Sequence, residues 1–357
     1  GVRLFSSRFL HKVQKNQKYF ERDDTMISLK EIGRICGLSE STVSKALKGN
    51  PAIRRSTAQR VAEVARKYGY QPNAMVQCMQ TGQSRSIGIA YNNFRCQFAG
   101  QVMEGIQQVL HENNYDSFVI QWDKLVKDKI ELLGRFARRR VDGILLFPPE
   151  TADPGGRLAE LRNIHSPIVV IDQRWPGHDF DYVGSSNRKG MYELISYLIG
   201  QGYRRFGVIA FPATSSGEER KRGFLDAMFE HKLPVDASLL TVAEEPLLSP
   251  YEAARSLLER PDRPEALVCF NDYIAREALN AAWDLRIRVP EELAVTGFGN
   301  LPLCDLVRPR LTTVDQFSFE TGVAAARLLL ERISSTGNPE RRDIVIDTKV
   351  VIRNSNR

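Results

Sequence analysis

From Ser86 to the end of the chain, short apolar runs alternate with longer stretches whose apolar residues repeat at helical spacing. The short runs are predicted strands: IGIAY, SFVIQW, GILLF, IVVI, FGVIA, ALVCF and LAVTGF. The helices are expected between them, over 99–112, 125–139, 188–200, 220–231, 251–259, 273–284 and 319–333. This alternation favours parallel sheets with helices on both faces. Because about 270 residues exceed one such sheet, we expect an α/β core of two lobes with a cleft between them.

The first quarter of the chain shows a different pattern, that of short capped helices. Ser28 and Glu31 form a capping-box pattern, and Gly37 is expected to end the helix that they begin. Ser39 is the candidate N-cap of a second helix, and STAQ at 56–59 is a further capping-box pattern that begins a third. Two helices joined by a tight turn and braced by a third predict a helix-turn-helix.

The positive charge of the chain is confined to this first quarter. Residues 1–84 carry 15 Lys and Arg against 6 Asp and Glu, a net charge of +9. Residues 85–357 carry 35 against 37, a net charge of −2. A basic domain beside a nearly neutral body is typical of a nucleic-acid-binding module. A solvated basic tail is the alternative interpretation.

The predicted second helix is rich in hydroxyl groups. The second helix of a helix-turn-helix enters the major groove with its N-terminus first. Glu40, Ser41 and Lys45 are therefore predicted to meet base edges, since lysine suits the acceptors of guanine and glutamate can accept from cytosine. Three hydroxyl groups are predicted to bind phosphates: those of Ser39, Thr42 and Ser44. A small helical bundle without a DNA partner is the alternative.

The run STVSKALKG, followed by RV, an alanine and GYQPN, resembles the N-terminus of the LacI/GalR family of bacterial transcription regulators. The resemblance continues more loosely over nearly all of residues 27–357. It implies a hinge helix, ordered on DNA, in which Met79 replaces the family's leucine wedge in the minor groove. It also implies that Tyr70 and Asn73 contact the DNA backbone. For Met79, a linker residue without a wedge role is the alternative.

The same resemblance implies a core similar to that of periplasmic sugar-binding proteins, with chain crossings near Ser185, Val314 and Asp343. The chain is expected to have four parts: a disordered extension (1–26), a helix-turn-helix domain (27–71), a hinge helix or linker (72–84), and an effector-binding and dimerisation core (85–357). Within the core, lobe 1 is expected over about 85–185 and 315–342, and lobe 2 over about 186–314 and 343–357.

Effector-binding residues follow from the resemblance position by position: Asp172, Arg220, Asn271 and Asp272. Arg220 leads an RxxGF pattern, and its guanidinium suits hydroxyl groups or a carboxylate. For Asp172 and Asp272, helix capping or a hydrogen bond at the hinge between the lobes is the alternative. Asn92 and Phe94 follow the first strand and are candidates to supply an amide and an aromatic face, although packing is the commoner role of such an aromatic ring.

The family pattern GFDD reads GFGN here, which leaves Asn300 as a further predicted effector-binding residue but no acidic pair. The cleft has thereby lost negative charge. We therefore predict that the effector is a sugar or an acidic or phosphorylated metabolite.

Several classes of protein are disfavoured. Five cysteines without CxxC spacing, and no paired Cys/His cluster, predict reduced thiols and no metal. The GFG at 297–299 lacks the third glycine of a dinucleotide turn, so neither a cofactor nor an enzyme is expected. No apolar run reaches about 18 residues, which disfavours a membrane partner. The RRR at 138–140 is assigned to a helix C-terminus facing solvent.

The resulting prediction is a bacterial transcription regulator, and more specifically a repressor, that acts as a homodimer on an inverted repeat in double-stranded operator DNA. We expect it in the cytoplasm, associated with the nucleoid. The alternative is a solute-binding protein without a regulatory role, which requires a signal peptide and no DNA-binding head.

Overall fold

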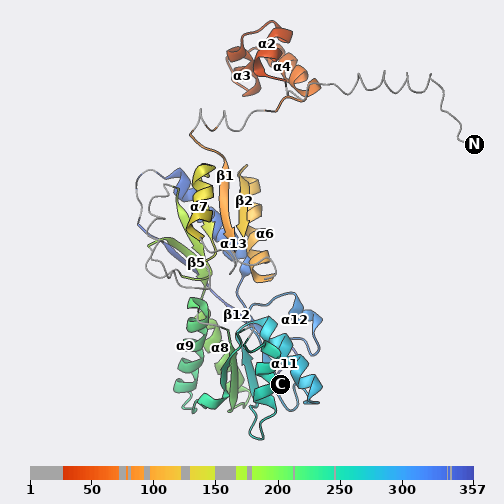
Figure 1. The fold of residues 1–357 in the computed structure, drawn as a ribbon, viewed down its shortest axis with the longest axis vertical. Helices are drawn as coiled ribbons and strands as arrows, with labels where there is room; N and C mark the ends of the chain where they lie inside the picture. Colours follow the sequence, from red (N-terminus) through yellow and green to blue (C-terminus); the bar gives the residue numbers. More distant parts are fainter. Residues whose placement is uncertain are drawn as a thin grey trace, which may run out of the picture. The chain divides into compact units, whose positions relative to one another are not determined.

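The computed structural model describes residues 27–71, 78, 82–91, 97–121, 129–148, 166–174, 179–211, 214–244, 247–335, 337 and 340–357. The chain divides into two compact units, Gly1–Gly82 and Gln83–Arg357 (Figure 1). We call the described helices of the first unit the head and the second unit the core. The predictions for the extension 1–26, most of the hinge, and Asn73, Met79, Asn92 and Phe94 fall outside the described residues.

The head contains three helices, α2 (Leu29–Cys36), α3 (Glu40–Leu47) and α4 (Arg55–Lys67). The capping box of α2 is confirmed: the hydroxyl of Ser28 accepts the N–H of Glu31 at 3.2 Å, and the Glu31 carboxylate accepts the N–H of Ser28 at 2.8 Å. Gly37 ends this helix in the left-handed conformation, with φ of 63°. Ser39 caps α3 as predicted, because its hydroxyl accepts the N–H of Thr42 at 3.2 Å.

The capping box predicted at Ser56 is wrong. Helix α4 begins at Arg55, two residues before the start that Ser56 as N-cap predicts, and its N-cap residue Arg54 provides no side-chain cap. Ser56 therefore lies inside the helix. The N-terminus of α4 is the weakest helix start in the head, since no side chain of its N-cap residue satisfies its first N–H groups.

The head packs around six buried side chains: Ile32, Cys36, Val43, Ala46, Val61 and Ala65. The turn between α2 and α3 presses against Gly33, where an added Cβ would lie 2.7 Å from the carbonyl oxygen of Leu38. From α4, the guanidinium of Arg60 donates to the carbonyl oxygen of Cys36 at 2.8 Å and so satisfies the end of α2. The third helix thus braces the helix-turn-helix through both its core face and this hydrogen bond.

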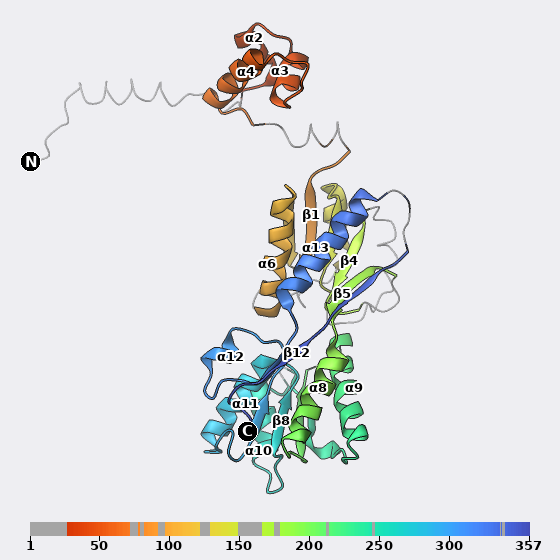
Figure 2. The same cartoon turned by 180° about the vertical axis from the view of Figure 1, so that it is seen from behind.

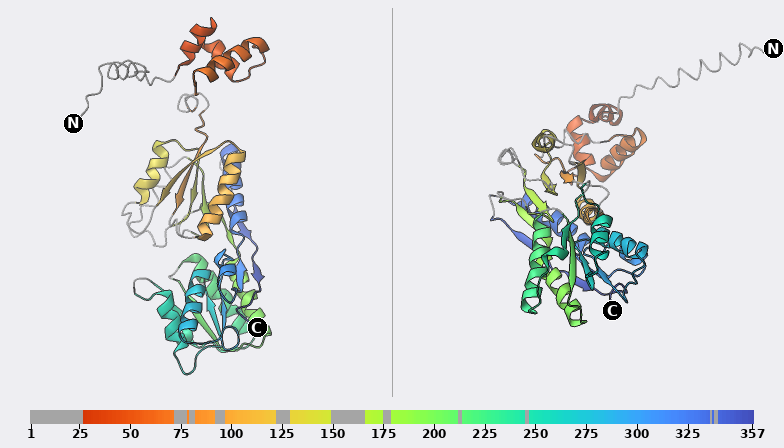
Figure 3. Two further views of the ribbon diagram at one scale, coloured as in Figure 1. Left: turned by 90° about the vertical axis from the view of Figure 1, so that its right-hand side faces the viewer. Right: turned by 60° about the horizontal axis from the view of Figure 1, so that its bottom comes forward.

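Lobe 1 of the core is built on a six-stranded parallel sheet in the order β11-β5-β4-β3-β1-β2. The strands are β1 (Ser86–Tyr91), β2 (Asp116–Gln121), β3 (Gly143–Leu146), β4 (Ile168–Ile171), β5 (Asp181–Ser185) and β11 (Asp343–Ile346). Helices α6 (Gln97–Glu112) and α13 (Ser318–Ser334) cover one face, and α7 (Lys129–Arg138) covers the other (Figure 3, left).

Lobe 2 is built on a four-stranded parallel sheet in the order β7-β6-β8-β9. Its strands are β6 (Phe206–Ala210), β7 (Leu240–Val242), β8 (Ala266–Cys269) and β9 (Ala294–Thr296), with a 3₁₀ turn η2 (Ala237–Leu239) before β7. Helices α8 (Asn187–Gly200) and α9 (Ser215–Glu230) pack on one face, and α10 (Pro250–Leu258) and α11 (Asp272–Asp284) pack on the other. The short helix α12 (Leu303–Leu306) follows β9.

The chain crosses between the lobes three times, and Figure 2 shows the connecting segments from behind. The first crossing follows β5, and the second runs from β10 (Thr313–Asp315) to α13. The third was expected near Asp343, but β11 pairs with β5 in the sheet of lobe 1, so the chain crosses only after Ile346. It then enters β12 (Lys349–Val351), which pairs antiparallel with β10. Residues 343–346 therefore belong to lobe 1.

Candidate functional site

Helix α3 turns one apolar and one polar face in opposite directions. Val43 and Ala46 are buried in the core of the head, whereas Glu40, Ser41 and Lys45 are exposed. These are the three residues predicted to read bases, and the helix places them on one solvent-facing surface. They are available to a partner without any rearrangement of the head.

The hydroxyl groups on α3 and at its N-cap differ in exposure. Ser39 is exposed, while Thr42 and Ser44 are half-buried, and the Ser39 and Thr42 hydroxyls are hydrogen-bonded to each other at 2.8 Å. Tyr70 packs against the core of the head. Burial, and after it the negative charge of Glu40, raise the pKa of Tyr70 above its ordinary value. The polar surface of α3 and the phenol of Tyr70 are therefore close enough to interact electrostatically.

A second candidate site is a cavity of about 220 Å³ between the two lobes of the core. Phenylalanine rings form much of its wall: Phe98 and Phe147 from lobe 1, and Phe211 and Phe298 from lobe 2. Its polar lining consists of Asp172, Gln173, Thr214, Ser216, Arg220, Asn271, Tyr273 and Gln316. Beside it the lobes contact each other, since the Tyr273 hydroxyl accepts the N–H of Gln97 at 3.0 Å. The volume corresponds to about seven waters at roughly 30 Å³ each, which suits a small metabolite.

Arg220 is the buried cation of this cavity, with 4% of its surface exposed. Its Nε donates to Oδ1 of Asn187 at 2.9 Å, and its Nη1 donates to the carbonyl oxygen of Phe270. The guanidinium carbon lies 4.0 Å from the centre of the Phe298 ring. Burial lowers the pKa of Arg220 to about 10, against the opposing charge of Asp172 and other acids, so the group stays cationic at neutral pH. Its remaining N–H groups have no partner among the described residues and are available to a ligand.

Asp172 is the carboxylate of the cavity lining. It directly follows β4 in a left-handed conformation, with φ of 68°, and its carbonyl oxygen accepts the Tyr182 hydroxyl at 2.9 Å. Burial raises the pKa of Asp172 to about 6, and the positive charge of Arg220 opposes this rise. The cavity therefore holds one permanent cation and one acid that titrates near neutral pH.

Asn271 lines the cavity at the N-terminus of α11. Its Oδ1 accepts the N–H of Ile274 at 2.8 Å and caps the helix. The amide N–H groups of its side chain have no partner among the described residues and are left for a ligand. The residue predicted to bind the effector thus lines the cavity, and its amide nitrogen is the freer of its two polar groups.

Asp272 and Asn300 were also predicted to bind the effector, and the structure places neither in the lining of the cavity. Asp272 is fully buried: its carboxylate accepts the Thr313 hydroxyl at 2.5 Å and the N–H of Leu301 at 2.9 Å. The side-chain amide of Asn300 donates to Asp315 at 2.8 Å and accepts from Arg353 at 2.9 Å. Both side chains hold the segments around β10 together, and their role in effector binding stays a prediction; a hydrogen bond at the hinge was the alternative for Asp272.

The packing around Gly299 favours a glycine at this position, where the family pattern has an acidic residue. Gly299 has φ of 139°, and an added Cβ would lie 2.9 Å from Oδ2 of Asp272. A side chain at this position would meet the buried carboxylate of Asp272. The loss of negative charge from the cleft is thus tied to the way in which Asp272 is packed.

Gln316 was missed by sequence reasoning. It is 3% exposed, lines the cavity, and its amide nitrogen has no hydrogen-bond partner among the described residues. Its backbone carbonyl oxygen accepts the hydroxyl of Ser185 at 3.0 Å, so Gln316 lies where two of the crossings meet. The useful signal in the sequence was its position directly after a short strand that leaves lobe 2. A buried donor without a partner is costly, and a ligand acceptor would remove that cost.

Three further observations concern metal ions, membranes and thiols. No cluster of three or more His, Cys, Asp or Glu suited to a metal ion occurs in the described part of the chain. No helix within those same residues is both long and apolar enough to cross a membrane. Cys269 is buried, and burial raises the pKa of its thiol.

A basic helix-turn-helix head with an exposed polar face on its second helix, joined to a two-lobed core around a small charged cavity, defines a DNA-binding transcription regulator that responds to a small molecule. Comparisons with known proteins agree with this class. Residues 28–73 match the family of bacterial regulatory proteins known as the lacI family, and residues 195–356 match a periplasmic binding protein-like domain. The chain belongs to the lacI family of bacterial regulatory proteins. The prediction of a regulator and not an enzyme is confirmed.

The relatives match over nearly their whole length. The probable HTH-type transcriptional repressor ExuR of Bacillus subtilis is 27% identical over 336 residues, covering 92% of this chain and 98% of that one. The HTH-type transcriptional repressor PurR of Escherichia coli O139:H28 is 28% identical over 334 residues, covering 92% and 97%. The structure of the lac repressor dimer bound to operator and the anti-inducer ONPF aligns with a TM-score of 0.82 at 18% identity, covering 93% and 99%. This last likeness shows that the fold is shared.

Proposed function

We propose that the protein is a transcriptional repressor that acts as a homodimer in the bacterial cytoplasm, bound to operator DNA in the nucleoid, and that a small molecule in the core cavity controls its affinity for DNA. The observation that carries this proposal is the exposed polar face of α3 on a basic head, within the first 84 residues that hold the whole positive excess of the chain. Named repressors among the relatives support repression, and a dimer bound to operator among similar structures supports the homodimer.

At the DNA, α3 divides the work between two sets of side chains. Glu40, Ser41 and Lys45 are exposed together and read base edges in the major groove. The hydroxyls of Ser39, Thr42 and Ser44 bind phosphates and fix the register of the helix, and Tyr70 and Asn73 contact the DNA backbone. Met79 acts as the apolar wedge in the minor groove at the centre of the operator. A two-fold symmetric dimer would read an inverted repeat.

In the core, the ligand lies between Arg220, Asp172 and the amide of Asn271, with Asn92 and Phe94 as further contacts. The unpartnered N–H groups of Arg220 suit a carboxylate or a phosphate, which accept two parallel hydrogen bonds. The polar lining and the aromatic walls suit a hydroxylated ring. We therefore propose a sugar-like metabolite with an acidic group as effector.

The DNA part of the proposal is tested by selection from a library of random duplexes with the full chain. Retained sequences should share an inverted repeat, and binding to them should fall steeply as salt rises, because phosphate contacts release counterions. Retention of duplexes without any common sequence would contradict specific recognition. Failure to retain duplex DNA at low salt would contradict the whole proposal.

The effector part is tested by thermal unfolding in the presence of sugars, sugar acids and sugar phosphates. A ligand that binds only the folded state raises the melting temperature of the core. Acidic sugars should raise it, and Arg220→Gln should abolish the rise. Stabilisation by neutral monosaccharides alone would contradict the acidic effector and leave the cavity as the site.

A further inference from the structure

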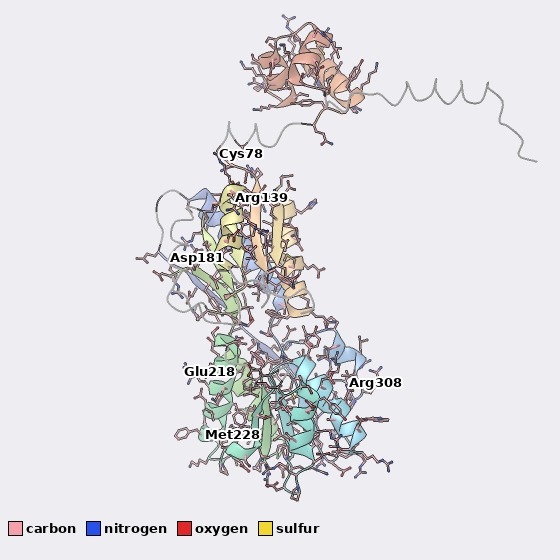
Figure 4. All side chains as sticks on the ribbon, viewed as in Figure 1. Cys78, Arg139, Asp181, Glu218, Met228 and Arg308 are labelled. Carbon is pink, nitrogen blue, oxygen red and sulfur yellow. The ribbon has the colours of Figure 1, made fainter. Side chains whose placement is uncertain are left out.

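Five arginines gather at one end of lobe 1: Arg85, Arg135, Arg138, Arg139 and Arg140. All five are exposed. They lie where β1 begins and α7 ends, and Figure 4 labels Arg139 at this end of the lobe. We call this surface the arginine end. It stands out because residues 85–357 carry a slight net negative charge overall.

Hydrogen bonds to the backbone and contacts with aromatic rings hold this surface together. The Asp142 carboxylate accepts the N–H of Ser84 at 2.7 Å and that of Arg85 at 2.9 Å, which fixes the start of β1 beside the turn after α7. The Arg139 guanidinium lies 4.9 Å from the centre of the Phe118 ring, and that of Arg85 lies 5.1 Å from the centre of the Tyr115 ring. Stacking on a ring orients a guanidinium while leaving its N–H groups at the edge for a second partner.

The other edge of the same sheet, where β5 and β11 begin, offers an internal comparison, because its arginines are paired with acids. Arg332 contacts Asp181 at 2.6 Å, and Arg342 contacts Glu331 at 2.8 Å. Arg341 likewise contacts Asp343 at 2.9 Å.

At the arginine end, no carboxylate of a described residue forms an ion pair with any of the five guanidiniums. The carboxylates of Glu112, Asp116 and Asp142 flank this end of the fold, and Glu131, which has a partner of its own, lies one turn before Arg135 on α7. The Asp142 carboxylate accepts from backbone N–H groups, and that of Glu112 accepts from Gln108 at 2.9 Å. The five cations therefore exceed the acids around them and lack direct ion pairs among the described residues, which is the arrangement that suits an external polyanion.

The covalent connection to the head limits what that polyanion can be. Gln71 ends the described helical part of the head, and Gln83 begins the core. A fully extended chain spans at most about 3.5 Å per residue, so these two residues are never more than roughly 40 Å apart. This tether keeps the head and the core of one chain together, so DNA bound by α3 is present at a high effective concentration for the arginine end.

We propose that the arginine end of lobe 1 binds the phosphates of duplex DNA that flanks the sequence read by α3. The contact adds affinity without sequence preference, because arginines on phosphates carry no base information. This inference rests on the proposed function, since it requires the head to hold DNA.

The test uses the full chain with Arg138, Arg139 and Arg140 each replaced by Gln. A matched control replaces Arg222, Arg286 and Arg310 by Gln, three exposed arginines of lobe 2 that form no ion pair among the described residues. The probes are a short duplex that ends at the footprint of the selected operator and a long duplex with about one helical turn, roughly 10 base pairs, added on each side. Affinity is measured by fluorescence anisotropy over a range of salt concentrations.

We expect the parent and the control to bind the long duplex about tenfold more tightly than the short one, and the triple variant to lose this gain. The slope of log K against log salt on the long duplex should become shallower by about 0.9 for each phosphate that the variant no longer neutralises. Sequence preference on the short duplex should not change. If the triple variant melts at a lower temperature than the parent, the single variant Arg139→Gln replaces it in the test. This variant should lose affinity for the long duplex only, and by less than the triple variant.

The inference is overturned if the variant and the parent bind the long duplex equally, or if the variant loses affinity equally on both lengths, which would place the effect in the head. A parent that binds neither duplex contradicts the proposed function itself. The two failures are therefore distinguishable.

Discussion

The two proposed binding regions, the exposed face of α3 and the cavity of the core, differ in how far their polar groups are exposed to water. On α3, Glu40, Ser41 and Lys45 stand in water on a strongly basic head. In the core, Arg220 is 4% exposed and already hydrogen-bonded to Asn187. The first region works by charges that water and salt screen. The second region binds through groups that are desolvated and already held in position, so the loss of one atom or the gain of one proton changes the free energy more.

The largest expected effect follows from the buried side of this comparison. Arg220→Gln should lower effector affinity at least about 100-fold and destabilise the core by about 3 kcal/mol, because it leaves the Asp172 and Asp272 charges uncompensated. Titration calorimetry with the ligand identified by thermal unfolding measures the first effect. Arg222→Gln, two residues along the same helix and exposed, is the control and should change neither. Equal losses of effector affinity and stability in the two variants would contradict a special role for the buried Arg220.

On the exposed side, the expected effects are smaller and differ in kind. Lys45→Ala should cost about 1–3 kcal/mol at one base pair of the operator and relax the preference there. Thr42→Val should weaken binding to all sequences about equally, since a hydrogen bond to phosphate carries no base preference. Binding to a panel of operators with single base-pair changes separates the two outcomes. A uniform loss in Lys45→Ala would remove it from the base-reading set.

The same contrast explains how far the sequence could be interpreted. The strands IVVI and FGVIA were predicted with the bounds that the structure gives to β4 and β6, because a short apolar run is nearly all that a buried parallel strand requires. Strands β5 and β11 were missed: DYVGS is buried but has few apolar residues, and DIVI is a four-residue edge strand that is half-buried or exposed. The third crossing was misplaced for that reason.

For the sites, the head was easier to interpret than the cavity. The exposed face of α3 follows from one local helical repeat that begins at Ser39. The lining of the cavity depends on which side of a turn faces the neighbouring lobe, and no local pattern reveals it. Asp272 and Asn271 are adjacent in sequence, yet Asn271 lines the cavity and Asp272 is buried behind it. Gln316 could not be identified without knowing that its segment crosses between lobes.

The next prediction concerns the protonation of Asp172 in the buried cavity. The folded pKa of Asp172 is about 6, above the ordinary value of 3.8, so its contribution to stability is present at low pH and is lost as pH rises through 6. The stability of Asp172→Asn relative to the parent should therefore increase by about 1–2 kcal/mol in free energy of unfolding between about pH 5 and pH 7.5. Thermal unfolding of both proteins across this range measures the difference. An acidic effector should also bind the parent more tightly at the lower pH. A constant difference between parent and variant would contradict the assignment.

The smallest effect concerns the stability of the head alone. Ser28→Ala removes the capping box of α2 and should destabilise the head by about 1 kcal/mol. Ser56→Ala is the matched control, because Ser56 lies inside α4 and caps nothing. Thermal unfolding followed by circular dichroism should show the difference in the head transition only. A loss of the same size in Ser56→Ala would restore the capping role that the structure denies it.

The most direct test of the account is the affinity of the full chain for its selected operator as salt is raised from about 50 to 200 mM. Counterion release predicts a loss of at least about a thousandfold over this range for six or more phosphate contacts per dimer. The same chain should show little change in effector affinity over the same range, since that site is buried. Affinity for duplex DNA that is absent at low salt, or that does not depend on salt, would contradict a regulator that holds operator DNA through its basic head.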